Sequence, residues 1–188
     1  QGLEAQLRAV GVVATVVACD SADSCDLNEL QSVNVVTAVL HTAGIGDKGL
    51  LLDLHAQRVG WMHGPKASGA WHLQCATLTT PLRSRVLFSS VGSGLGNVGQ
   101  ANYAAGNACL DALALSRRAL GEVACSLQWP LIGGAGMGAA AFAAMGEPRV
   151  AIAGQASVSL EQYATCLGAQ LITGVGSALS VQVVHRAD

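Results

Sequence analysis

The stretch FSSVGSGLGNVGQANYAAGNACLDAL, from Phe88 to Leu113, decides the fold because it joins a buried strand to a long helix through a glycine-rich loop. The loop carries a formal G-x-G-x-x-G pattern at Gly94, Gly96 and Gly99. Such a pattern between a strand and a helix can cradle the pyrophosphate of a dinucleotide. However, the acidic residue that follows, Glu122, precedes the next predicted strand, whereas a ribose contact requires it at a strand end.

A second interpretation assigns the chemistry of this stretch to its side chains. Ser90 ends the strand, and Tyr103 follows near the start of the helix. Asn107 comes four residues after Tyr103, so both side chains project from one helical face. The glycines would then let the loop pass close beneath a ligand, while a purely structural alternative packs Tyr103 against the sheet. The residues alone leave these alternatives open.

Strand and helix patterns alternate on both sides of this stretch. Short apolar runs predict strands over Val12–Ala18, Val35–Gly44, Arg85–Ser90, Val123–Trp129 and Ala178–His185. Helical patterns cover Leu3–Val10, Leu27–Ser32, Leu52–Thr79 with an interruption near Gly64-Pro65, Gln100–Leu120 and Leu160–Thr173. This alternation predicts one α/β domain with a doubly wound, largely parallel sheet covered by helices.

Several predicted strands carry chemistry-bearing residues at their carboxyl ends. They are Asp20, His41 to Gly44, Ser89-Ser90 and Trp129-Pro130. Because ligands of parallel sheets bind beyond the carboxyl ends of the strands, we expect a site at this edge. The order of elements opens on a helix end instead of a strand and a glycine-rich turn. We therefore expect either a fragment of a dinucleotide fold or a phosphate loop placed elsewhere.

The composition narrows the classes of function. Charged residues make up 12% of the chain, about half of the ~25% usual for soluble domains. This low charge fits either a surface partly covered by neighbouring protein or a general bias toward Ala and Gly. The net charge of −2 without a basic cluster argues against nucleic-acid binding. No apolar run reaches the ~20 residues of a membrane span, so we expect neither a membrane span nor a signal peptide.

The cysteines predict reduced thiols. The chain has six Cys without C-x-x-C or zinc-finger spacing, and most of them stand in apolar sequence. We therefore expect core thiols in a cytoplasmic protein, with no metal site.

Val86–Gly121 resembles the ketoreductase domain of modular polyketide synthases, which belongs to the short-chain dehydrogenase/reductase superfamily. Further matches are Ala18–Asp23, Val39–Leu51, Pro65–Leu73, Ser126–Trp129, Gly134–Gly138 and Ser157–Leu171. The resemblance covers essentially the whole chain. It implies a single ketoreductase domain over residues 1–188 with a Rossmann-like fold. The family's first strand and its T-G-G-x-G-x-x-G turn have no counterpart, so the domain is expected to be partial at its N-terminus.

The resemblance also implies a catalytic set. Tyr103 would protonate the substrate carbonyl oxygen, and Ser90 would hydrogen-bond to it. Lys66 matches the family lysine, and Asn107 stands where the wider superfamily has a lysine. A free tyrosine has a pKa of ~10, whereas an ammonium group ~4 Å away contributes about 4 kcal/mol at an effective dielectric constant of ~20. Lys66 is therefore expected to make Tyr103 a better acid at neutral pH.

The implied cofactor is NADPH. Asp20 and Ser21 resemble the positions that meet the adenine. The positions beneath the adenosine ribose are His41, Thr42, Ala43 and Gly44, and those near the nicotinamide are Trp129 and Pro130. The family has glycine in place of Pro130, and the proline removes a backbone N–H.

The resemblance implies reduction of a carrier-bound β-ketoacyl chain in polyketide or fatty acid biosynthesis. Its partners would be an acyl carrier protein with a phosphopantetheine-tethered substrate and other synthase domains. A catalytically silent structural module is the alternative, whereas a free-standing dehydrogenase usually keeps its lysine on the tyrosine's helix. Both family markers of alcohol stereochemistry are altered, to Gly46-Asp47-Lys48 and Leu95. The family's substrate lid corresponds to Gly133–Gly146.

Overall fold

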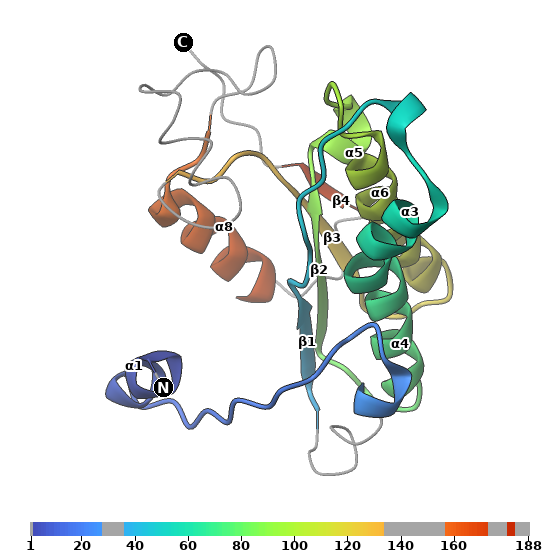
Figure 1. Cartoon of the computed structure of the whole chain (residues 1–188). Coiled ribbons are helices and arrows are strands. Elements are labelled where there is room, and N and C mark those ends of the chain that lie inside the picture. Colours follow the sequence, from blue (N-terminus) through green and yellow to red (C-terminus); the bar gives the residue numbers. More distant parts are fainter. Residues whose placement is uncertain (1, 28–35, 134–156, 173–179, 183–188) are drawn as a thin grey trace.

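The computed structural model describes residues 2–27, 36–133, 157–172 and 180–182 (Figure 1). The first half contains α1 (Gly2–Ala9), β1 (Ala38–His41), the 3-10 turn η1 (Leu51–Asp53), α3 (Ala56–His63), the π-helical turn η2 (Gly64–Ser68) and α4 (Gly69–Ala76). The second half contains β2 (Ser84–Ser90), α5 (Gly92–Leu95), α6 (Ala101–Ala119), β3 (Cys125–Trp129), α8 (Leu160–Ile172) and β4 (Ser180–Gln182).

The four described strands form one parallel sheet in the order β1-β2-β3-β4. Leu40 pairs with Val86, and Phe88 pairs with Leu127. The predicted α/β class with a parallel sheet is therefore confirmed. Because all four strands run the same way, their carboxyl ends meet at one edge of the sheet, where Ser90 and Trp129 lie side by side.

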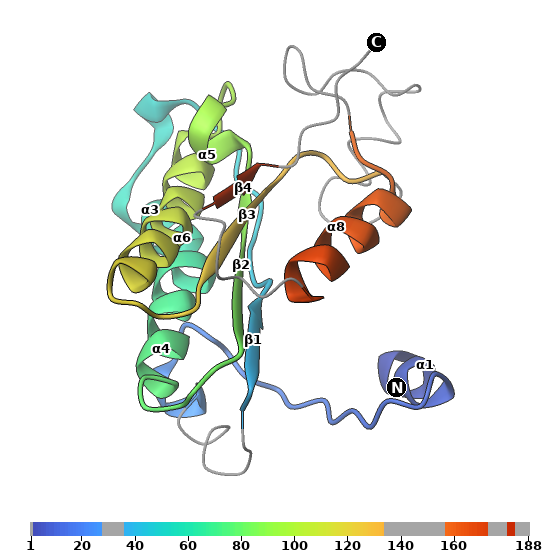
Figure 2. The ribbon, with the colours of Figure 1, turned by 180° about the vertical axis from the view of Figure 1, so that it is seen from behind.

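Helices cover both faces of the sheet. α3, α4 and α6 lie on one face and α8 lies on the other (Figures 1 and 2). On the α6 face Leu87 packs with Leu110 and Ala114, which are fully buried. On the α8 face the strand residues Phe88 and Leu127 form a cluster that includes Tyr163 and Leu167. Three aromatic rings meet in this cluster, where those of Trp129 and Tyr163 lie 4.5 Å apart.

The helical region predicted over Leu52–Thr79 forms one nearly continuous rod with an irregular turn in the middle. His55 caps the start of α3: its Nδ1 accepts a hydrogen bond from the Arg58 amide. The expected interruption at Gly64-Pro65 is the π-helical turn η2. Pro65 has no N–H to donate, so the local hydrogen-bond pattern widens there and the helix continues.

The strand predicted over Val12–Ala18 is wrong. Residues 12–20 are extended but belong to no strand, and Val13 and Val16 are exposed. A valine-rich run becomes a strand only when a neighbouring strand takes up its backbone hydrogen bonds. No described strand pairs with this segment, which leads from the sheet to α1 (Figure 1).

Smaller differences concern the lengths of elements. β1 is shorter than the predicted Val35–Gly44, because only Ala38–His41 pairs with β2. A helical turn covers residues 24–27, and the rest of the predicted helix Leu27–Ser32 lies outside the described residues. The same holds for nearly all of Gly133–Gly146 and for most of Ala178–His185. The helices predicted over Leu3–Val10, Gln100–Leu120 and Leu160–Thr173 are confirmed as α1, α6 and α8.

All six cysteines are free, but the expectation that most are core thiols is wrong. Only Cys125 is buried and Cys166 is half-buried, whereas four are exposed: Cys19, Cys25, Cys75 and Cys109. Cys75 and Cys109 stand among apolar neighbours in sequence but face outward on their helices, a direction that composition does not fix.

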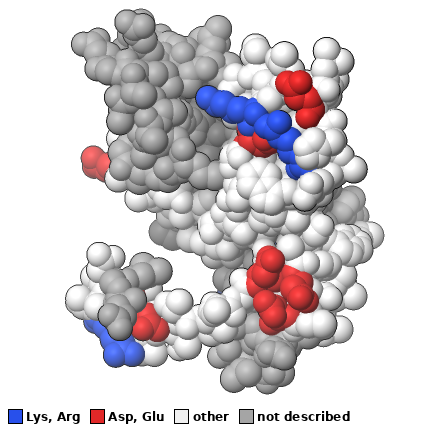
Figure 3. Space-filling view, viewed as in Figure 1, with Lys and Arg blue, Asp and Glu red and all other residues white. Residues whose placement is uncertain are grey.

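Charged side chains on the face in Figure 3 form small separate groups within a mostly uncharged surface. Within the described part of the chain, no helix is both long and apolar enough to cross a membrane. The same residues include no group of three or more His, Cys, Asp or Glu side chains placed to hold a metal ion.

Candidate active site

Ser90 lies at the carboxyl end of β2, where the strand turns into the glycine-rich loop. Its Oγ accepts a hydrogen bond from the Gly92 amide at 3.2 Å. The neighbouring Val91 amide donates to the Trp129 carbonyl oxygen at 3.0 Å, which fixes the start of the loop to β3. These contacts give the half-buried Ser90 hydroxyl a defined place at the edge of the sheet.

The glycines of the loop pack mainly against protein. A Cβ added to Gly94 would meet the Gln128 side chain, and one added to Gly99 would meet the backbone of Gly49. Gly96 and Gly99 have φ values of +73° and +71°, which only glycine adopts easily. The loop is thus shaped by a tight turn and a close backbone approach, an arrangement that favours the catalytic-floor interpretation over a phosphate cradle.

Lys66 is a buried cation held beneath the site. It projects from η2 with 3% of its surface exposed, and its Nζ donates to the Phe88 carbonyl oxygen at 2.8 Å. Two glycines make room for the side chain: a Cβ added to Gly44 would overlap Lys66 Cε, and one added to Gly106 would lie 3.7 Å from Lys66 Cβ. Lys66 therefore sits between the loop after β1, the end of β2 and the face of α6 that begins with Tyr103.

Tyr103 and Asn107 occupy successive turns of α6. Asn107 is fully buried, and its Nδ2 donates to the Tyr103 carbonyl oxygen at 2.9 Å. Within the described part of the chain, Asn107 Oδ1 has no hydrogen-bond partner. Tyr103 itself is half-buried. The four residues proposed from the sequence thus come from η2, the end of β2 and one face of α6, which are packed together.

A half-buried carboxylate that the sequence analysis missed lies one turn further along α6. Asp111 Oδ2 accepts hydrogen bonds from Ser93 Oγ at 2.6 Å and from Gln128 Nε2 at 2.8 Å, and Oδ1 accepts one from Ser126 Oγ. Ser93 Oγ also lies 2.8 Å from the Ser90 carbonyl oxygen. Tyr103, Asn107 and Asp111 follow each other at intervals of four, a spacing that could have revealed the third member.

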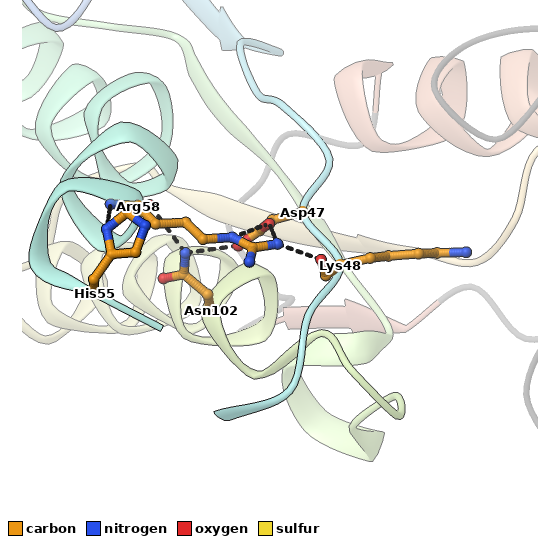
Figure 4. A network of polar contacts seen from close by, with 5 residues as sticks. All are labelled: Asp47, Lys48, His55, Arg58 and Asn102. Carbon is orange, nitrogen blue, oxygen red and sulfur yellow. Dashed lines mark hydrogen bonds and ion pairs between the residues drawn. The ribbon is translucent and has the colours of Figure 1, made fainter. Parts of the chain in front are cut away.

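A second network fastens the loop after β1 to the start of α6 (Figure 4). Arg58 Nε donates to Asp47 Oδ1 at 2.8 Å, and Asn102 Nδ2 donates to Asp47 Oδ2 at 2.9 Å. Arg58 Nη2 also donates to the Lys48 carbonyl oxygen. These hydrogen bonds hold the pKa of the Asp47 carboxyl below its usual value. Asn102 adjoins Tyr103, so the network links the loop directly to the turn that carries the tyrosine.

The residues proposed for the cofactor form two groups along the chain. The first group comprises Asp20, Ser21 and residues 41–44, and the second comprises Trp129 and Pro130. Asp20 and Thr42 are exposed, Ser21, Ala43 and Gly44 are half-buried, and His41, Trp129 and Pro130 are buried.

Within the first group, His41 Nε2 lies 3.3 Å from the Lys66 carbonyl oxygen, and burial lowers the pKa of its imidazole. Asp20 Oδ1 accepts a hydrogen bond from the Ala22 amide, which shapes the turn. Trp129, in the second group, packs its ring against Phe88 and Tyr163. Because the ring is packed there, the backbone of Trp129 is the part that a ligand at the edge of the sheet would meet.

Comparison with known proteins identifies the family. The model of the family described as "KR domain" matches residues 1–134. The chain belongs to the KR domain family. A relative in Streptomyces orinoci, the spectinabilin polyketide synthase system protein NorB, is 44% identical over 164 residues, which are 85% of this KR domain chain and 8% of the relative. Polyketide synthase GfsB of Streptomyces halstedii is 48% identical over 133 residues, 69% of this chain and 2% of that protein. The chain thus spans a small part of the relatives it matches.

Solved structures show the same fold for this KR domain. A structure of A-type ketoreductases from a modular polyketide synthase superposes with a TM-score of 0.86 at 32% identity, over 98% of this chain and 38% of that one. The first ketoreductase of the tylosin synthase gives a TM-score of 0.83 at 35% identity, over 98% and 40%. The fold is therefore the Rossmann-like fold of the short-chain dehydrogenase/reductase superfamily.

The burial of Lys66 gives the KR domain a measurable dependence of stability on pH. Burial lowers the pKa of Lys66 from 10.5 to about 8, and nearby Asp111 opposes that shift. Between these two values the unfolded chain binds more protons than the folded chain, so stability rises with pH.

We expect the wild-type free energy of unfolding to increase by about 2 kcal/mol, relative to Lys66→Met, between about pH 7.5 and about pH 9.5. Urea unfolding at both pH values measures the difference, and Lys48→Met, at an exposed lysine, is the control. Identical pH profiles for wild type and Lys66→Met would contradict the burial of the charged amine.

Proposed function

We propose that this domain reduces a β-ketoacyl thioester, carried by an acyl carrier protein, to the β-hydroxyacyl form with NADPH. The observation that carries the proposal is the buried Lys66 amine, which donates to the Phe88 carbonyl oxygen near the end of β2 while its side chain lies against Gly106 of α6. A buried ammonium close to a phenol stabilises the phenolate and lowers the pKa of the phenol, which favours transfer of its proton. Membership in the KR domain family supports the same reaction class.

The residues divide the work as follows. The Ser90 hydroxyl orients the substrate carbonyl by a hydrogen bond to its oxygen. Bound NADPH supplies the hydride that the carbonyl carbon accepts. Tyr103 gives its phenolic proton to the oxygen as negative charge develops there, and the resulting phenolate regains a proton from solvent. Lys66 stabilises that phenolate, and the unpaired Asn107 Oδ1 is available to accept a hydrogen bond in the loaded site.

A nicotinamide dinucleotide is the cofactor that we propose. The Asp20 carboxylate and the Thr42 hydroxyl are exposed, so they could meet polar groups of the adenosine. Ser21, His41, Ala43 and Gly44 would line the adenosine, and the Trp129-Pro130 backbone would face the nicotinamide. Asp20 lies in an acidic turn with Asp23 and Asp26, so the adenine end would be read by a carboxylate and not by a cation. The choice of NADPH over NADH rests on the family resemblance.

The setting that we propose is a cytoplasmic polyketide synthase in which other domains deliver and receive the carrier protein. The relatives named above are polyketide synthase proteins, which supports this setting over a fatty acid synthase. The loop that carries the altered stereochemical marker Gly46-Asp47-Lys48 is held in place by the hydrogen bonds of Asp47. The second altered marker, Leu95, is the last residue of α5. A silent structural module is the alternative outcome of the test below.

The test is an assay of β-ketoacyl thioester reduction, in which the loss of NADPH absorbance measures turnover. The chain is assayed alone and joined to the N-terminal nucleotide-binding segment of a related ketoreductase. We expect weak NADPH fluorescence enhancement for the chain alone, and binding in the micromolar range with turnover for the joined protein. NADPH binding without any turnover in the joined protein would show a silent module and reject the proposed activity.

A further inference from the structure

A cavity of about 250 Å³ lies at the end of the sheet opposite the proposed active site. Its walls come from the segment after α4, including Thr77, Thr80 and Pro81, and from the turn before β3 that contains Glu122. Arg85, the second residue of β2, closes it toward the sheet. Since β2 runs from Ser84 to Ser90, about 20 Å of strand separates this cavity from the Ser90 edge.

Arg85 is a buried charge with no carboxylate within ion-pair distance among the described residues. Its side chain is 3% exposed, and its Nη2 donates to Thr77 Oγ1 at 2.9 Å. Among the described residues, Arg85 Nε has no hydrogen-bond partner, and the ion pairs join other residues, Arg58 to Asp47 and Arg117 to Glu122. A buried guanidinium group without an anion is costly, so the cavity beside it is a place where an anion would be stabilised.

The charges around the cavity favour a single negative charge. Burial lowers the pKa of Arg85, Glu122 opposes this shift, and Arg117 reinforces it. Glu122 already lies 3.4 Å from Arg117 Nη1. Two guanidinium groups and one carboxylate therefore leave an excess of one positive charge, which a monoanion would neutralise and a dianion would exceed.

The uncharged walls favour an anion with an apolar part. Leu78, Pro81 and Leu82 line the cavity, and Leu78 is 61% exposed, so the cavity reaches the surface. Its volume is below the ~300–1,000 Å³ of sites for drug-sized ligands. A carboxylate can accept a charge-assisted hydrogen bond from the guanidinium group of Arg85. A short hydrocarbon chain would cover the leucine and proline walls.

We propose that this cavity is a binding site for a short-chain monocarboxylate, with the carboxylate on Arg85 and the chain against Leu78, Pro81 and Leu82. The site is separate from the reductase chemistry and does not depend on it.

The test is thermal unfolding of the 188-residue chain in sodium butanoate, compared with sodium chloride of equal ionic strength. At a tenfold excess over Kd we expect the wild-type Tm to rise by about 3–6 °C. Arg85→Met should abolish the rise, while Arg83→Met, at an exposed arginine two residues earlier, should keep it. Without butanoate, Arg85→Met should unfold at the wild-type Tm or above it, because an uncompensated buried charge is removed.

Three results would overturn the proposal. The first is a wild-type Tm that does not respond to butanoate. The second is an equal response in Arg85→Met. The third is an equal response of the wild type to inorganic phosphate, which would show that the apolar walls contribute nothing. Should Arg85→Met fail to fold, NMR of the wild type decides: butanoate must shift the Arg85 Nε–H and Thr77 signals, and shifts confined to other residues reject the site.

Discussion

Tyr103→Phe should lower kcat/KM for reduction of a β-ketoacyl thioester by about 10²–10⁴-fold, the range that a positioned general acid contributes. The substitution removes one hydroxyl from a half-buried side chain and leaves the α6 backbone contacts, including Asn107 to the Tyr103 carbonyl, unchanged. The Tm and the NADPH affinity are therefore expected to remain close to wild type. The comparison uses the joined protein described above.

Tyr163→Phe is the matched control for this experiment. Tyr163 lies on α8 and packs against the rings of Phe88 and Trp129 on the opposite face of the sheet. Loss of its hydroxyl should leave turnover within a factor of two or so. Retention of full activity in Tyr103→Phe would remove the general acid from the proposed mechanism, while an equal loss in both variants would indicate a structural effect.

Gly44→Ala should lower turnover by about 100-fold by displacing the Lys66 amine. An alanine Cβ would overlap Lys66 Cε and lie 2.9 Å from Nζ, whereas nonbonded carbon contacts are comfortable at ~3.5–4.0 Å. The amine must then move by roughly 1 Å from the Phe88 carbonyl oxygen, and such a displacement costs about 10²-fold in rate. Steady-state kinetics with the substrate varied at saturating NADPH measures the effect.

A control and a double variant separate this effect from a change in cofactor binding. At Gly46, two residues away, an added Cβ meets nothing within 4 Å, so Gly46→Ala should be close to wild type. In a background of Lys66→Ala, which lacks the long side chain, Gly44→Ala should cost little more. Additive losses in the double variant would mean that Gly44 acts independently of Lys66, which contradicts the packing argument.

The sequence predicts well what depends on local pattern. The runs around Val86 and Leu127 alternate with helices, and the parallel sheet follows from that alternation. The sequence also predicts that Ser90 lies at the carboxyl edge of the sheet, and the structure places it there, at the end of β2. Tyr103 and Asn107 follow from helical spacing.

Features that depend on tertiary contacts could not be predicted from such patterns. Val12–Ala18 has the composition of a strand, but strand formation requires a neighbour that the run itself does not encode. The burial of Lys66 depends on the absence of side chains at Gly44 and Gly106, which lie far apart in the sequence. Arg85 is charged and was expected only as the first residue of a strand, yet its register carries it into the interior. The Asp47 network likewise joins residues up to 55 positions apart.

The π-helical turn η2 has a consequence for changes in chain length. Such a turn holds one residue more than an α-helix would place in the same span. Deletion of Ala67 would allow regular α-helix throughout, and the side chains of α4 would keep their directions, because the turn already holds the extra residue. Ala70 and Gln74 would then stay in the interior, whereas a one-residue deletion within α3 would rotate them by about 100° and expose them. The turn should therefore tolerate the loss of one residue far better than the regular helix beside it, and a library of one-residue deletions across residues 62–70 would reveal that asymmetry.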